Sequence, residues 1–145
     1  MMTLEIHTTG ISKDNVGGWG YRLSYGGHTK YAQGCEEFAN SDRMELMAVL
    51  EALKSLKTTS KPTRVYTDSW YVFNGHDCPH VRQLRNNDLW NELHDIIKRF
   101  NNIEFNIVKS ESDISNVAIQ HIKLLVKDKI REYDDMLWLE QHGFI

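Results

Sequence analysis

The sequence predicts an α/β fold with a five-stranded mixed sheet: three antiparallel strands, then two parallel strands, with helices on both faces. Two observations support this prediction. Strand-like segments separated by glycines come first, and helical and strand-like segments then alternate along the chain. A meander pairs antiparallel, whereas a strand, helix, strand succession gives parallel strands with helices packed on the sheet.

The early segments alternate in the manner of a strand and end near glycines. The first, Leu4–Ser12 ("LEIHTTGIS"), is predicted to run into a tight turn at Gly10. The segments "GGWGYRLSYGG" and "HTKYAQGCE" continue the meander, with a hairpin turn near Gly26 and Gly27. Two further strands are predicted at "TRVYT" and "NIEFNIVK".

Three helices are predicted between and after these strands. "SDRMELMAVLEALKSLK" begins at a Ser/Asp cap and places Leu46, Leu50 and Leu53 on one stripe. "DSWYVFNG" is a short helix ended by Gly75. "NNDLWNELHDIIKRF" is a longer helix, capped around Asn87 or Asp88.

The remaining segments complete the predicted single domain, 1–145. Apolar residues at helical spacing predict another helix from Asp113 to Asp128, and the tail "REYDDMLWLEQHGF" predicts a separate one. The core is expected over about 3–129 and the C-terminal helix over about 131–142. A chain of 145 residues is long enough for such a core.

Charge and composition limit the function classes. A net charge of −3 argues against strong non-specific binding to nucleic acid. The lysines late in the chain, including Lys123 and Lys127, are predicted to form a solvated helix face. Cys35 and Cys78 lack CxxC spacing and are expected to be free thiols. With no membrane-length apolar run and no signal sequence, we expect a cytoplasmic protein without membrane contact.

Several polar side chains lie at positions that suit catalysis or metal binding. Glu45 lies on the apolar stripe of its helix, although with Asp42 it also resembles a capping box. Asp68 follows a buried strand, where metal sites collect, although an aspartate there can also cap a helix. His121 lies on or beside an apolar helix face, where a lone histidine is more often structural than a ligand. Glu111 precedes that helix and suits capping.

The motifs "DRMELMAVLEALK", "YTDSWYV" and "NNDLW", in this order after "GGWGYRLSY", resemble type 1 ribonuclease H. The resemblance covers roughly Leu4 to Leu125. It implies a ribonuclease H-like fold and a hydrolase that cleaves the RNA strand of RNA/DNA hybrids as an endonuclease. It also implies two divalent ions, Mg²⁺ or Mn²⁺, held by carboxylates.

Placed residue by residue, the resemblance assigns the four metal-binding acids to Thr9, Glu45, Asp68 and His121, and the loop histidine to Glu111. Glu45 and Asp68 are thus the expected catalytic acids, and His121 is a substitute metal ligand. Two of the four acids are absent. A threonine hydroxyl cannot supply the missing charge, so Mg²⁺ or Mn²⁺ is expected to bind weakly or not at all.

The resemblance also indicates substrate-binding positions. Asn15 in the first loop is kept, whereas Ser41 and Asp42 replace two asparagines and Trp70 replaces a glutamine. Asp42 would bring a negative charge near phosphates. Trp70 would stack on a base or sugar, or bury itself in the protein.

Three functions follow as hypotheses. The first is a ribonuclease H-like protein with impaired or lost cleavage that still binds an RNA/DNA hybrid, another nucleic acid or a protein partner. The second is a manganese-preferring endoribonuclease with a site rebuilt from Glu45, Asp68, His121 and Glu111. The third is a protein-interaction module that docks through Met136–Trp138 in the tail. We expect a monomer.

Overall fold

The computed structural model describes residues 2–78, 85–109 and 113–145. Its elements occur in the predicted order of strands and helices. They are β1 (Leu4–Lys13), β2 (Val16–Tyr25), β3 (His28–Glu37), α1 (Ser41–Lys54), β4 (Thr63–Thr67), α2 (Trp70–Gly75), α3 (Asn87–Ile97), β5 (Ile103–Ile107) and α4 (Ile114–Gln141).

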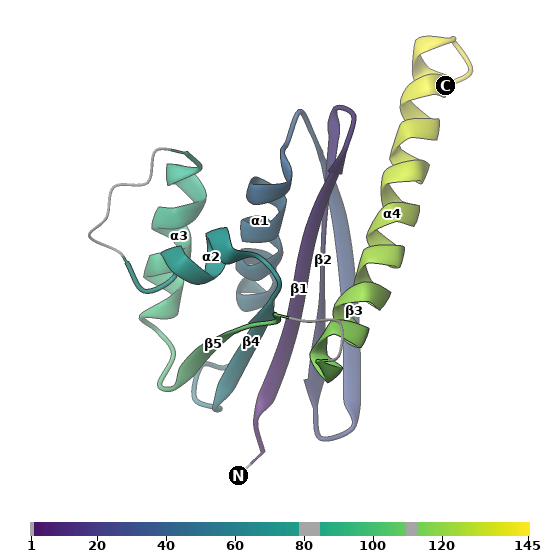
Figure 1. Ribbon diagram of the computed structural model, residues 1–145. Coiled ribbons are helices and arrows are strands. Elements are labelled where there is room, and N and C mark those ends of the chain that lie inside the picture. The colour runs from purple at the N-terminus through teal and green to yellow at the C-terminus, as the bar shows by residue number, and fades with distance from the viewer. Residues whose placement is uncertain (1, 79–84, 110–112) are drawn as a thin grey trace.

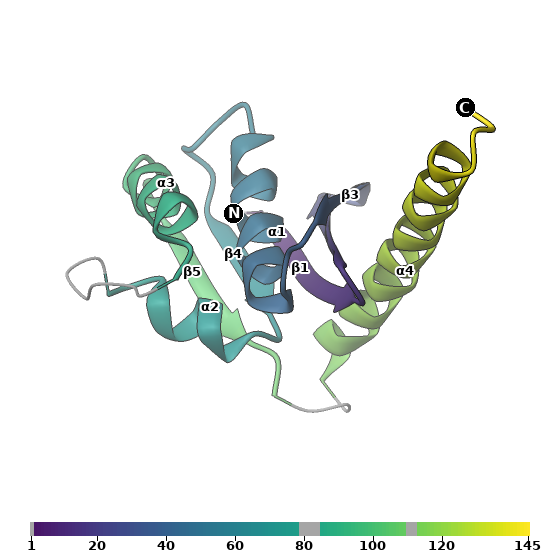
Figure 2. The ribbon, with the colours of Figure 1, turned by 90° about the horizontal axis from the view of Figure 1, so that it is seen from above.

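The five strands form one mixed sheet in the order β3-β2-β1-β4-β5. β1 pairs antiparallel with β2, β2 pairs antiparallel with β3, and the β1–β4 and β4–β5 pairs are parallel. The helices cover both faces, with α1, α2 and α3 on one side and α4 on the other (Figures 1 and 2). The predicted fold class is therefore confirmed.

Two clusters of buried side chains hold the helices on the sheet. The larger lies between the sheet and α1–α3 and includes Ile6, Leu50, Val65 and Trp90. The smaller joins α4 to the sheet through Val16, Ile122, Val126 and Ile130. The predicted stripe of Leu46, Leu50 and Leu53 is buried in the larger cluster.

The sequence predicted a turn at Gly10, but the first strand continues through this residue. Gly10 lies inside β1 and pairs with Trp19, and the chain reverses at Asp14, where φ is 56°. Gly10 is needed there because α1 crosses it closely: a Cβ on Gly10 would lie 2.2 Å from the backbone nitrogen of Glu45. The second predicted hairpin is confirmed, with φ of 56° at Gly26 and 84° at Gly27.

The helix caps differ from the predicted ones by one or two residues. α1 is capped by Asn40, whose side chain accepts a hydrogen bond from the backbone nitrogen of Arg43 at 2.9 Å, and not by Ser41 or Asp42. Ser69 caps α2 by accepting from the backbone nitrogen of Val72. Asp68 is therefore not the N-cap residue of α2.

The N-terminal cap of α3 also differs from the predicted one. The residue before α3 is Asn86, in the left-handed conformation with φ of 59°, and not Asn87 or Asp88. Asparagine is one of the few residue types besides glycine that adopt this conformation readily.

The prediction of two helices at the end of the chain was wrong. α4 is one helix of 28 residues, and its last turns project beyond the sheet (Figure 1). Residues 129–134 contain neither glycine nor proline, so nothing in the backbone interrupts the hydrogen-bond ladder. No described helix is both long and apolar enough to cross a bilayer. Cys35 and Cys78 are free thiols, as predicted.

Candidate active site

The structure brings Glu45 and Asp68 together. Asp68 follows β4 directly, and Glu45 lies in the first turns of α1, which Gly10 allows to approach β1. The side chain of Glu45 is only 7% exposed. Burial raises the pKa of the Glu45 carboxyl group well above its ordinary value, the negative charge of Asp68 raises it further, and the backbone N–H of Gly10 opposes this rise.

Thr9 completes the buried side of this pair. Its hydroxyl donates to Oε1 of Glu45 at 3.5 Å, and its side chain is fully buried. The structure thus places the Thr9 hydroxyl beside Glu45. A hydroxyl there is neutral and adds no negative charge to the pair.

A third charged group joins the site from α4. Nζ of Lys123 lies 2.9 Å from Oδ2 of Asp68, and the two side chains are 26% and 19% exposed. Sequence reasoning missed this contact because Lys123 was assigned to a solvated helix face. The available signal was its position next to Ile122 and four residues after Ile119, both buried against the sheet.

His121 does not join the two acids. Its ring lies edge-on to Tyr31 of β3, with 5.5 Å between ring centroids. Within residues 2–78, 85–109 and 113–145, no three His, Cys, Asp or Glu side chains are grouped as metal ligands. The predicted three-ligand set of Glu45, Asp68 and His121 is therefore not formed. Glu111 lies outside the described residues.

The side chains that are present do not fit two divalent ions. Oε2 of Glu45 and Oδ1 of Asp68 are buried and have no hydrogen-bond partner in the described part of the chain, so they could accept one cation. However, these two carboxylates already share the positive charge of Lys123. Thr9 contributes only a hydroxyl. The donor set is too small and too weakly negative for a pair of dications.

Three of the predicted substrate-binding residues lie at the starts of α1 and α2. Ser41 and Asp42 open α1, and Asp42 is paired with Arg85 at 2.8 Å, which offsets its negative charge. Trp70 opens α2, is 53% exposed, and contacts Phe73 edge-on. Trp70 is thus available at the surface and not buried.

Asn15 lies on the turn between β1 and β2. The backbone carbonyl oxygen of Asn15 accepts a hydrogen bond from the backbone nitrogen of Phe38, at 2.6 Å. Phe38 follows β3 and precedes α1. The contact ties this turn to the segment that leads into Ser41 and Asp42.

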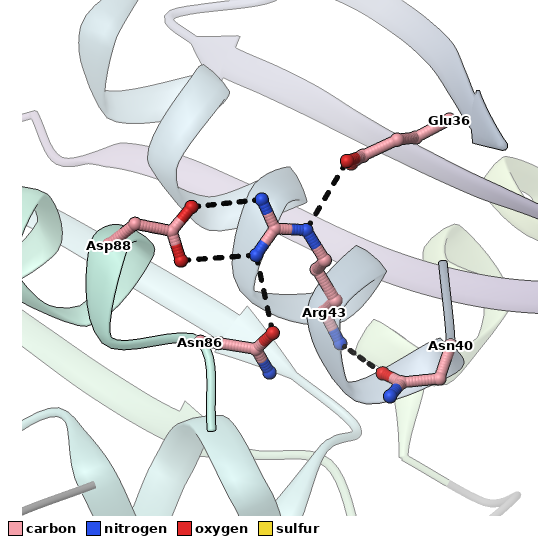
Figure 3. A network of polar contacts seen from close by, with 5 residues as sticks. All are labelled: Glu36, Asn40, Arg43, Asn86 and Asp88. Atoms are coloured by element: carbon pink, nitrogen blue, oxygen red, sulfur yellow. Dashed lines mark hydrogen bonds and ion pairs between the residues drawn. The ribbon is translucent and has the colours of Figure 1, made fainter. Parts of the chain in front are cut away.

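A polar network at Arg43 holds this region in place (Figure 3). Both terminal nitrogens of Arg43 donate to the carboxylate of Asp88, at 3.1 and 2.9 Å, and one also donates to Oδ1 of Asn86. Nε donates to Glu36 at 3.3 Å. Arg43 therefore connects α1 to β3 and to the start of α3. Sequence reasoning had not assigned Arg43 a role.

Comparisons with known proteins show what this chain is similar to. The family model for RNase H matches residues 2–123. A protein named Ribonuclease H from Syntrophomonas wolfei is 35% identical over 127 residues, covering 77% of this chain and 86% of that protein. Another Ribonuclease H, from Caldicellulosiruptor saccharolyticus, is 33% identical over 145 residues, covering 88% of this chain and 99% of that protein.

Among solved structures, the crystal structure of RNase H1 from the halophilic archaeon Halobacterium salinarum matches with a TM-score of 0.68. The match covers 90% of this chain and 98% of that chain, at 13% sequence identity, and so supports the fold. The family model and the sequence relatives identify the family. The chain belongs to the ribonuclease H family.

Proposed function

We propose that this protein binds nucleic acid as other members of the ribonuclease H family do, and that its metal-dependent cleavage of RNA/DNA hybrids is impaired. The observation that carries the proposal is the buried threonine at position 9. Its hydroxyl contacts Glu45 at the place where the family resemblance assigns an acid. The remaining pair, Glu45 and Asp68, is partly neutralised by Lys123.

The electrostatics of the site support impaired cleavage. In the family, divalent ions supply an activated water and stabilise the leaving oxygen. Holding them requires ionised carboxylates. The site has the carboxylates of Glu45 and Asp68, but position 9 adds only a neutral hydroxyl. The ammonium group of Lys123 lies against Asp68 and offsets part of their charge, so little negative charge is left to hold such ions.

The surface around the site supports binding. Trp70, two residues after Asp68, presents an exposed aromatic ring, and base–aromatic stacking contributes on the order of 1–3 kcal/mol per base. Arg85 offsets the charge of Asp42, so this face is less repulsive to phosphates than the sequence indicated. The turn that carries Asn15 is hydrogen-bonded to Phe38, three residues before Ser41, so Asn15 and Ser41 add polar groups near the start of α1.

The test is a cleavage time course on a labelled RNA/DNA hybrid, in Mg²⁺ and separately in Mn²⁺. Glu45→Gln is the matched inactive control, and an active family member is the positive control. Binding of the same hybrid is followed by fluorescence anisotropy. We expect binding that weakens on Trp70→Ala, and no cleavage above the Glu45→Gln protein in either metal. Cleavage that depends on Glu45 would overturn the proposal of impairment, and absence of binding would overturn the proposal of nucleic-acid recognition.

A second candidate is favoured by one observation. The unpartnered oxygens of Glu45 and Asp68 provide acceptors for a single cation. A one-metal enzyme that prefers Mn²⁺ would then cleave slowly. Cleavage in Mn²⁺ but not in Mg²⁺, abolished in Glu45→Gln, would support this candidate in place of the first.

A further inference from the structure

The ion pair between Lys123 and Asp68 lies inside the candidate site, not on an open surface. Nζ of Lys123 is 2.9 Å from Oδ2 of Asp68, and both side chains are largely covered. Beyond Asp68 lies the buried carboxyl group of Glu45. One positive charge therefore stands directly against two acids.

The fold keeps the Lys123 ammonium at this depth. Ile122 and Val126, on either side of Lys123 in α4, are fully buried against the sheet. A Cβ on Gly18 of β2 would lie 2.5 Å from Val126, so the glycine lets α4 pack closely on the strand. Because α4 is a continuous helix held on both sides of Lys123, the lysine stem begins close to the acids.

We propose that the ammonium group of Lys123 stands in for a divalent metal ion beside Asp68, and thereby keeps the affinity of the Glu45–Asp68 pair for divalent cations low. The inference deepens the proposed impairment of cleavage and rests on it for its biological meaning. It concerns the affinity of the free protein for metal, and its test needs neither substrate nor turnover.

The charges make the direction of the effect clear. A dication beside Asp68 would either displace Nζ or lie within a few ångströms of a like charge, where repulsion in a partly buried site is strong. The unpartnered oxygens, Oε2 of Glu45 and Oδ1 of Asp68, show that acceptor capacity remains in the described part of the site. Removing the ammonium therefore leaves a pair of acids that is better suited to a cation.

Lys127 provides the matched control. It lies four residues after Lys123 on the same helix, is exposed, and lines the open groove beside Lys13 and Arg131. Replacing Lys127 changes the net charge by the same amount without touching Asp68. A charge effect that acts over the whole molecule would appear equally in both variants.

The experiment measures Mn²⁺ binding to the full chain by isothermal titration calorimetry, with no nucleic acid present. We expect Lys123→Met to bind Mn²⁺ at least about tenfold more tightly than the unaltered protein, since a nearby like charge has been removed. Lys127→Met and the charge-conserving Lys123→Arg should bind as the unaltered protein does. Adding Asp68→Asn to Lys123→Met should abolish the gain and so locate it at this site.

Each alternative result has a defined meaning. Equal affinities of the unaltered protein and Lys123→Met would overturn the inference, and so would an equal gain in Lys127→Met or a gain that survives Asp68→Asn. If Lys123→Met does not fold, as judged by circular dichroism, Lys123→Gln carries the same expectation with an amide that still donates to Asp68. Hybrid cleavage by the unaltered protein would overturn the proposed function without deciding this titration.

Discussion

Gly10 shows how a single residue positions the candidate site. Its missing side chain lets the first turns of α1 lie on β1, with the Glu45 backbone nitrogen where a Cβ would otherwise be. The same approach brings the Gly10 backbone N–H to the Glu45 carboxyl group, whose pKa it lowers against the opposing effect of burial. Any larger residue at this position would push α1, and Glu45 with it, away from the sheet.

His7 is a second residue with a consequence that can be measured. It is 2% exposed in β1, stacks on Tyr66 with 4.7 Å between ring centroids, and has Arg22 at 3.4 Å from Nδ1. Burial, and then the charge of Arg22, lower the pKa of His7 from 6.5 to about 4, while Asp113 opposes the shift. The His7 imidazole is therefore neutral in the folded protein at pH values where it is protonated in the unfolded chain.

This shift predicts acid sensitivity. Because the unfolded state binds the additional proton between pH 6.5 and 4, stability is lost as the pH falls through that window, by up to about 3 kcal/mol. In His7→Phe, which retains a ring for Tyr66, the free energy of unfolding should depend less on pH. Urea unfolding at several pH values measures it, with exposed His28→Gln as control. An unchanged pH dependence in His7→Phe would contradict the prediction.

At the scale of the elements, Arg43 joins three pieces of the fold. It contacts Glu36 of β3, Asn86 before α3, and Asp88 within α3 (Figure 3). The pKa of Asp88 is lowered chiefly because Arg43 donates hydrogen bonds to it. A planar guanidinium group can make these contacts at once, whereas an ammonium group cannot reproduce the paired geometry.

We therefore expect Arg43→Lys to lower the free energy of unfolding by about 1 kcal/mol, since an ammonium group cannot make both hydrogen bonds to Asp88 and the one to Glu36 in this partly exposed network. The comparison is Arg131→Lys, which alters an exposed pair with Asp128 and should change stability by less than about 0.5 kcal/mol. Urea unfolding of both variants decides the matter. Equal losses would show that the Arg43 network contributes no more than a surface ion pair.

The sequence was sufficient to predict the type and order of the elements up to α4, because those depend on periodicity within each segment. It did not show that the last two predicted helices are one. Residues whose role depends on contacts with distant parts of the chain could not be predicted in the same way. Gly10 resembled a turn because its reason, the approach of α1, lies 35 positions further along the chain. The caps at Asn40 and Ser69 were misassigned because several neighbouring polar residues could each serve.

The candidate site shows the same division. The family resemblance assigned Glu45 and Asp68 to one site, and the structure brings these two carboxyl groups close together. On α4 the prediction chose His121, whereas Lys123 reaches Asp68. Two residues along a helix turn a side chain by about 200°, so a small error in alignment points to the opposite side.

At the scale of the whole molecule, the boundary of the folded unit can be placed more closely than the sequence allowed. A core ending near Lys129 was predicted, but Ile130 is buried under the sheet, and the hydroxyl of Tyr133 donates to Glu37 at 2.9 Å. Beyond Tyr133, α4 projects outward and carries the exposed side chains of Met136 and Trp138.

Two truncations test this boundary. A chain ending after Asp134 should melt within about 2 °C of the full chain, because it loses no buried side chain. A chain ending after Lys129 should melt several degrees lower, since losing a buried isoleucine costs on the order of 2 kcal/mol or more. Light scattering on the full chain and on the chain that ends after Asp134 tests the expectation of a monomer. Self-association through the projecting turns would appear in the full chain and be lost in the truncated chain. Equal melting of both truncated chains would place the boundary before Ile130.

The pairing of β1 also has a consequence for the order in which the chain becomes structured during its synthesis. β1 finds one partner early, since Glu5 pairs with Ser24, but its other partner much later, since Leu4 pairs with Thr63. Until β4 leaves the ribosome, the emerging β-meander exposes one open edge along β1, most of whose residues are buried in the finished fold. Such edges recruit strands from other molecules. Translation speed between α1 and β4 therefore sets how long each nascent molecule is exposed to aggregation.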